Sequence, residues 1–286
     1  IDNLEVQLME GWNLIGSVSS SSGISDPDNI VVPGTVYGFP YSIPVGIMSS
    51  GDGYWALATQ EGMVTLSSNA ALPKLSSEIL SNILTINEMK LSFGVEVTEE
   101  LALSYSLPPK PPEGIFDVRF SGDSRIAGDA AAIEIQNPLD ELLIEYSIVN
   151  GAGDHMLWIL AIESGNEFIL DGVGSISLPG NVTGLTLNKV PEIPEMFGLS
   201  QNYPNPFNPI TRINYQIPEA SDVTITVYNM MGQKIADLVN GYLPAGYHQV
   251  VWDSRTVFGE AVASGIYFYT LTAGDKRFLN KMILMK

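Results

Sequence analysis

The sequence predicts an all-β protein made of tandem β-sandwich domains, with at most one short helix. Apolar and polar residues alternate with a period of two in many segments of strand length, which places the apolar side chains on one face. The chain has 27 glycines and 18 prolines, and these favour turns between short strands. A helical period extends over more than a few residues only near residues 75–90.

Residues 1–86 form the first predicted domain, a small β domain. Its apolar segments, such as GWNLIGSV and GDGYWALA, are separated by glycine turns, so each has the length of one strand. Near the end of this zone apolar residues recur at helical spacing, namely Leu75, Ile79, Leu80, Ile83 and Leu84. We expect the short helix there, near residues 75–90.

Residues 87–190 form the second predicted domain, an antiparallel β-sandwich. In the segment FDVRF at residues 116–120 three apolar side chains alternate with two charged ones, so the apolar side chains share one face of a strand. Alternation of this kind gives about eight strand candidates, and strands with one apolar face pack economically in two layers.

Residues 200–286 form the third predicted domain, an Ig-like or fibronectin-like sandwich. A linker containing Pro191 and Pro194 precedes it over residues 191–199. The alternation is regular in TITVYNM and GIYFYTLTA. Six or seven such strands close a two-layer sandwich.

The charge is distributed unevenly along the chain. Residues 1–197 hold six basic and 26 acidic side chains, whereas residues 198–286 hold seven basic and six acidic ones. The first part therefore carries a net charge of −20 and the second +1. An acidic field repels phosphate backbones, so we expect no nucleic-acid partner.

The composition also restricts the possible chemistry. The chain has no cysteine and two histidines, which removes disulfides, thiolate metal sites and histidine-rich metal sites. No nucleophile elbow and no phosphate-binding glycine loop occurs. The longest apolar runs are far shorter than the roughly 20 residues of a membrane span. We therefore expect no enzyme, no resident cofactor and no membrane span. Because the chain begins at Ile1 rather than at a methionine, we expect it to be a processed or excised piece of a longer precursor.

The third domain carries a family resemblance. The segments LSQNYPNPFNPITRINYQIP, VTITVYNMMGQKIADLV, LPAGYHQVVWD, ASGIYFYTL and KMILMK follow one another in order. They resemble the C-terminal sorting domain of the type IX secretion system, type A, over its full length. Upstream, GWNLIG and GDGYW resemble a small β module that precedes such domains in secreted proteins.

The resemblance implies export across the outer membrane of a Gram-negative bacterium, with the secretion machinery as partner and an extracellular or cell-surface location. In the family this domain is usually removed from the mature protein, whereas here it is present. The residues that match the motifs are Asn205, Pro206, Phe207, Asn208, Pro209, Gly246, Tyr247, Gly265, Tyr267, Lys281 and Lys286.

Two features of the first domain suggest ligands. Tyr37, Tyr54 and Trp55 fall near glycine and proline turns, where exposed rings stack on sugars; filling a small core is the alternative. Asp26 and Asp28 supply hard oxygen donors for calcium, but they lack the spacing of an EF-hand loop. A turn stabilised by an Asp side chain is the other interpretation.

These observations predict a secreted, surface-associated and non-catalytic β-domain protein with an adhesive or structural role. One alternative is the non-catalytic C-terminal portion of a larger exported hydrolase. Another is a self-assembling extracellular filament or layer subunit that associates through strand edges.

Overall fold

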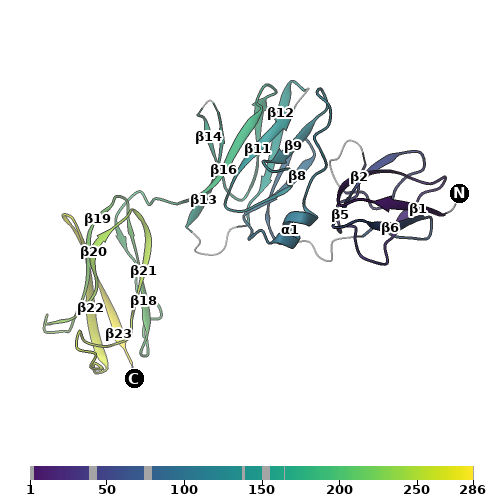
Figure 1. The fold of residues 1–286 in the computed structure, drawn as a ribbon. Helices are drawn as coiled ribbons and strands as arrows, with labels where there is room; N and C mark the ends of the chain where they lie inside the picture. The colour runs from purple at the N-terminus through teal and green to yellow at the C-terminus, as the bar shows by residue number, and fades with distance from the viewer. Residues whose placement is uncertain are drawn as a thin grey trace. The chain divides into compact units, whose positions relative to one another are not determined.

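The computed structural model describes residues 3–38, 44–73, 79–136, 139–149, 155–163 and 165–285. Within these ranges nearly all of the regular secondary structure is β-strand (Figure 1), which confirms the all-β prediction. The chain forms two compact units, Ile1–Val190 and Pro191–Lys286. None of the helical segments described is long and apolar enough to cross a membrane.

The first unit begins with two three-stranded sheets. Their strands are β1 (Asn3–Leu8), β2 (Gly11–Gly16), β3 (Gly23–Ser25), β4 (Tyr37–Gly38), β5 (Gly53–Ala58) and β6 (Gly62–Ser67). The sheet orders are β1-β6-β3 and β2-β5-β4. Val64 and Leu66, alternate residues of β6, are buried with Leu8, Ile15 and Met48 in one core. The period of two thus gives each sheet a core face.

The segment expected to be helical forms a hairpin of β7 (Asn82–Ile86) and β8 (Met89–Phe93). The helix prediction is wrong here, because Leu84 and Ile86 are both fully buried and follow the strand period. A short apolar run fits both periods, and pairing within a sheet decides between them. The earlier part of the predicted helix, residues 74–78, lies outside the described residues.

Because of this hairpin, the second sandwich begins earlier in the sequence than predicted. β7 pairs with β12 (Glu141–Ser147), so the boundary expected between residues 86 and 87 falls in the hairpin turn. Asn87 and Glu88 have φ values of 42° and 77°, as a tight two-residue hairpin turn requires. Strand pairing, which composition does not reveal, therefore places β7 in the second sandwich.

This sandwich has two five-stranded sheets, with orders β10-β8-β7-β12-β15 and β14-β13-β16-β11-β9. The remaining strands are β9 (Asp117–Phe120), β10 (Ile126–Ala127), β11 (Ala130–Gln136), β13 (Met156–Ile162), β14 (Glu167–Leu170), β15 (Val173–Pro179) and β16 (Gly184–Pro191). Both sheets contribute to one core, where Phe93 meets Trp158 edge to face at 4.7 Å.

One short helix, α1 (Glu99–Ser104), precedes β9. The hydroxyl of Thr98 accepts the N–H of Leu101 (3.3 Å), and Glu99 and Glu100 occupy the first turn. The hydroxyl cap satisfies a free backbone N–H at the start of the helix. The acidic residues there interact favourably with the positive end of the helix dipole.

Two buried arginines lie inside the first unit. Arg119 is fully buried and pairs with Asp117 (Nε to Oδ2, 2.6 Å) and with Asp123 (Nη1 to Oδ1, 2.8 Å). Arg125 lies against the rings of Tyr37 and Tyr105, 5.3 and 5.4 Å from their centroids. Because Tyr37 belongs to β4, this cation–π contact connects the first sheets with the segment before β10.

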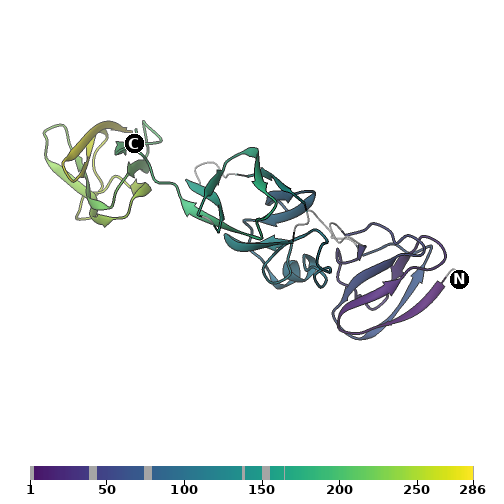
Figure 2. The same cartoon turned by 90° about the horizontal axis from the view of Figure 1, so that it is seen from above.

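The second unit is a two-layer sandwich. Its strands are β17 (Gly198–Leu199), β18 (Thr211–Ile217), β19 (Ser221–Tyr228), β20 (Lys234–Leu243), β21 (Gly246–Trp252), β22 (Gly265–Ala273) and β23 (Lys276–Leu284). They form the sheets β17-β18-β21 and β20-β19-β22-β23. Figure 2 views this unit along its strands.

The core of this unit follows from the alternation in its strands. Val223, Ile225 and Val227 of β19 are fully buried, and residues between them face outward. β16 ends at Pro191 and β17 begins at Gly198. The connection therefore covers residues 192–197 of the linker expected over 191–199.

Candidate recognition site in the C-terminal unit

The first motif of this unit lies against its last strand. The backbone of Phe207 donates to the carbonyl of Ile283 (3.0 Å) and accepts from the N–H of Met285 (2.9 Å). The side chain of Asn205 accepts the N–H of Ile283 (3.0 Å), 78 residues away in the sequence. We call residues 205–207 and 283–285 the terminal latch, because these three hydrogen bonds join the beginning of the unit to its end.

The side chain of Phe207 anchors this latch in the core. It is 2% exposed, and its ring centroid lies 5.7 Å from that of Trp252. Trp252 in turn meets Tyr267 edge to face at 5.4 Å, and the Tyr267 hydroxyl donates to the carbonyl of Ala263 (2.7 Å). Three of the motif segments thus contribute aromatic rings to the same core cluster.

Asn202, which the sequence motifs did not single out, fixes the chain before the latch. Its side-chain amide donates to the carbonyl of Pro204 (3.1 Å) and the hydroxyl of Thr211 (2.9 Å). Its backbone N–H donates to the Tyr269 hydroxyl (2.8 Å). Burial raises the pKa of Tyr269, which keeps that hydroxyl in its neutral form. An asparagine two residues before a proline is the sequence signal for such a turn.

The remaining motif residues occupy different positions. Gly246 pairs with Ile217 and Trp252 with Thr211 in the ladder between β18 and β21, so Gly246 and Tyr247 lie at the end of β21 away from the Phe207–Trp252 cluster. Gly246 has a φ of 144°, a conformation that favours glycine. The structure does not bring all the motif residues together.

The other motif residues lie near the latch or outside the described residues. Pro206 and Asn208 are exposed, and the carbonyl of Pro209 accepts the hydroxyl of Ser254. Gly265 pairs with Leu284 in the ladder between β22 and β23. Lys281 is exposed opposite Phe268. Lys286 lies outside the described part of the chain.

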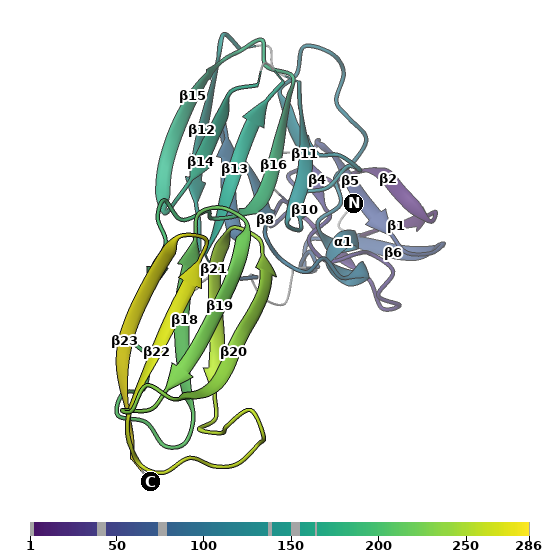
Figure 3. The same ribbon diagram turned by 90° about the vertical axis from the view of Figure 1, so that its left-hand side faces the viewer.

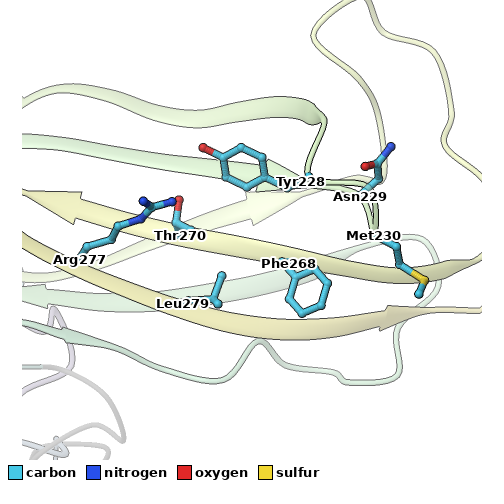
Figure 4. Close-up of a pocket in the computed structure, with 8 residues that line it drawn as sticks. Tyr228, Asn229, Met230, Phe268, Thr270, Arg277 and Leu279 are labelled. Carbon is cyan, nitrogen blue, oxygen red and sulfur yellow. The ribbon is translucent and has the colours of Figure 1, made fainter.

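A shallow groove of about 380 Å³ lies on the outer face of the four-stranded sheet, the sheet whose strands are seen side by side in Figure 3. We call it the basic groove, because an exposed arginine of β23 lines it. Figure 4 shows its side chains. The lining residues are Tyr228, Asn229, Met230, Gly232, Phe268, Thr270, Arg277 and Leu279.

An ion pair supports the sheet beside this groove. The hydroxyl of Thr226 donates to Asp237 (2.9 Å), and the ammonium group of Lys234 lies 2.5 Å from the same carboxylate. The hydrogen bond from Lys234 lowers the pKa of Asp237. This carboxylate is therefore satisfied within β19 and β20, and is ionised at neutral pH.

The aromatic residues proposed as ligand contacts lie mostly in the core. Tyr37 is fully buried and Tyr54 is 4% exposed, and the Tyr54 hydroxyl accepts the N–H of Ser49 (2.6 Å). Trp55 is half-buried. Stacking on a sugar needs an exposed ring face, so the buried rings of Tyr37 and Tyr54 are unsuitable for binding a sugar. They fill the core of the first domain instead.

The two aspartates considered as calcium ligands have different environments. The carboxylate of Asp26 accepts the backbone N–H groups of Ile30 (3.0 Å) and Val31 (2.7 Å), whereas Asp28 is exposed. Both oxygens of Asp26 are thus used in a turn. Within the described ranges no three His, Asp or Glu side chains are grouped as a metal would require.

Comparison with known proteins gives one family match. Residues 209–277 match the model of the FlgD Ig-like domain, so the C-terminal unit contains an Ig-like domain. No curated protein sequence matches the chain.

Two solved structures share weak similarity with the chain. One is PorZ, an essential bacterial surface component of the type IX secretion system of Porphyromonas gingivalis, with 17% identity and a TM-score of 0.25 over 38% of this chain and 15% of PorZ. The other is dimeric latent PorU of the same organism, with 11% identity and a TM-score of 0.27 over 99% of this chain and 30% of PorU. The chain therefore spans less than a third of either protein.

Proposed function

We propose that the protein is a secreted, surface-associated and non-catalytic β-protein, exported through its C-terminal unit as a type IX sorting domain. The terminal latch is the observation that carries this proposal. It joins the motif at residues 205–209 to the end of β23, and these are two of the segments that resemble the sorting family. The Ig-like match of residues 209–277 supports the fold that the resemblance implies.

The latch provides a folded surface for recognition. Phe207 points into the core and fixes the backbone, while Asn205, Pro206 and Asn208 beside it are exposed. Lys281 is exposed on the adjoining strand β23. The secretion machinery would therefore recognise two distant segments as one surface, and it would select folded cargo over unfolded cargo.

Export from a Gram-negative host with a type IX system tests this proposal. We expect that deletion of residues 198–286 leaves the protein in the periplasm. We also expect that Asn205→Ala, which removes the side-chain acceptor of the latch, lowers export severalfold while the rest of the core remains. The matched control is Asn240→Ala, at an exposed position of β20. Unimpaired export of the deletion variant would falsify the proposal.

The alternative that this chain is the C-terminal portion of a larger exported hydrolase leaves the role of the C-terminal unit unchanged. The two possibilities differ only in what the complete gene encodes upstream. Sequencing that gene distinguishes them, because a catalytic domain upstream would be recognisable.

A further inference from the structure

We propose that the basic groove binds an extended acidic peptide of a partner protein. The groove lies on the outer face of the sheet and its lining residues differ from those of the terminal latch. This binding site therefore goes beyond the sorting function and does not depend on it.

The groove is built from three successive rows of side chains that cross the strands. Of the lining residues, Arg277 of β23 lies in the first row. Thr270 of β22 and Leu279 of β23 are paired in the second row, and Tyr228 of β19 and Phe268 of β22 are paired in the third. Successive rows are two residues apart, a spacing of about 7 Å along the strands.

The charged side chain of the groove lies at one end of it. Arg277 lies beside Thr270 at one end, and Phe268 and Met230 lie towards the other end (Figure 4). Thr270 is 4% exposed and forms the floor, whereas Leu279 is 62% exposed and forms a wall. A ligand must therefore combine a polar group for Arg277 with apolar groups for the remainder.

The charge of the groove requires that polar group to be anionic. Arg277 lines the groove and is exposed, and it forms no ion pair with a carboxylate in the described ranges. Residues 276–286 contain no acidic side chain, in a chain with a net charge of −19. A guanidinium group binds a carboxylate through two parallel hydrogen bonds, so Arg277 favours Asp or Glu.

The spacing of the rows favours a peptide as the source of the carboxylate. Side chains on one face of an extended chain also repeat every 7 Å or so. An acidic residue on Arg277 would place the residue two positions along over Thr270 and Leu279. The residue four positions along would reach Phe268 and Tyr228. A single sugar ring spans about one of these rows, and would leave the apolar end of the groove uncovered.

Isothermal titration of the 286-residue chain tests this site. The probe is the acetylated peptide amide Glu-Ser-Leu-Ser-Phe, and its control has Gln in place of Glu. We expect the acidic peptide to bind, and the Gln peptide to bind at least tenfold more weakly. We expect Arg277→Gln to weaken binding of the acidic peptide about tenfold or more, because it removes the charge-assisted bonds. Arg277→Lys should retain part of the affinity.

The matched control is Arg212→Gln, an exposed arginine of β18 in the other sheet, which should leave the affinity unchanged. Both arginines are exposed, so both variants should unfold at the same urea concentration as the unmodified protein. Absence of binding by the unmodified protein, or equal weakening by the two variants, would overturn the proposal. Binding of oligogalacturonate but not of the peptide would overturn the peptide as occupant.

Discussion

At the scale of single residues, Asn202 determines how the chain enters the C-terminal unit. Its amide satisfies the carbonyl of Pro204 and the hydroxyl of Thr211 in a site that is 2% exposed. We expect Asn202→Ala to lower the free energy of unfolding of this unit by about 1–3 kcal/mol, because buried polar groups lose their partner. Urea unfolding measures this change. Asn240→Ala should stay within about 0.5 kcal/mol of the unmodified protein, and equal losses would contradict the assigned role.

Asp237 gives a dependence of stability on pH. Its folded-state pKa is lowered by the hydrogen bond from Lys234, so the carboxylate stabilises the fold at pH values above its unfolded pKa of about 3.9. This contribution is lost as the pH falls through the lower folded-state pKa. We expect Asp237→Asn to make the free energy of unfolding less dependent on pH between about 5 and 2.

Denaturant unfolding at a series of pH values checks this expectation. The control is Asp222→Asn, an exposed position of β19 outside the ion pair. If the two variants lose stability equally steeply on acidification, the ion pair with Lys234 does not provide the effect.

The residues predicted from the sequence were those with a strong local signal. Phe207 was singled out as a motif residue between two prolines and two asparagines, which favour turns, and it is buried. Asn202 has a weaker signal, because its partners Thr211 and Tyr269 come from strands whose pairing the sequence does not specify. Arg277 in the groove was missed for the same reason, since its row depends on the register of three strands.

At the scale of elements, the hairpin of β7 and β8 contains a strained turn. Glu88 is exposed with a φ of 77°, a conformation that costs a non-glycine residue about 1–2 kcal/mol. We expect Glu88→Gly to stabilise the first unit by about 0.5–1 kcal/mol, because relief of strain exceeds the entropy that glycine adds to the unfolded state. Thermal unfolding measures the gain.

Glu88→Val provides the opposite substitution at the same position. A β-branched residue is poorly suited to positive φ, so this variant should unfold at a lower temperature than the unmodified protein. The strain assignment is wrong if the glycine and valine variants shift the unfolding temperature in the same direction.

Elements were predictable wherever a regular alternation extended over a whole strand. β19 and β22 follow from their sequences, because one face is core and the other solvent. The β7 segment was not predictable in this way, since its apolar residues fit two periods and its partner β12 lies more than fifty residues away. Helix α1 has six residues, too few for a helical period to identify it.

At the scale of the whole molecule, the two units have separate cores. The two apolar clusters of the second unit include residues from Phe197 onward, and those of the first unit end at Leu187. Residues 192–196 of the connection contribute to none of these clusters, and Phe197 packs against a core cluster of the second unit. The composition of the sequence predicted a linker here, but the strands that border it follow from pairing within each unit.

Separate cores imply that the C-terminal unit folds by itself. We expect that cleavage at a protease site inserted after Ile193, which is 62% exposed, leaves the unfolding temperature of this unit within about 3 °C of its value in the intact chain. A larger shift would correspond to a loss of about 0.5–1 kcal/mol for a domain of this size.

Scanning calorimetry before and after cleavage measures the difference in unfolding temperature. Anion exchange separates the fragments, because residues 1–193 carry a net charge of −19 and residues 194–286 carry a net charge of 0. If the unfolding transition of the C-terminal unit disappears on cleavage, this sandwich requires the first unit in order to fold. It could then not act as a sorting domain that is transferable to other cargo.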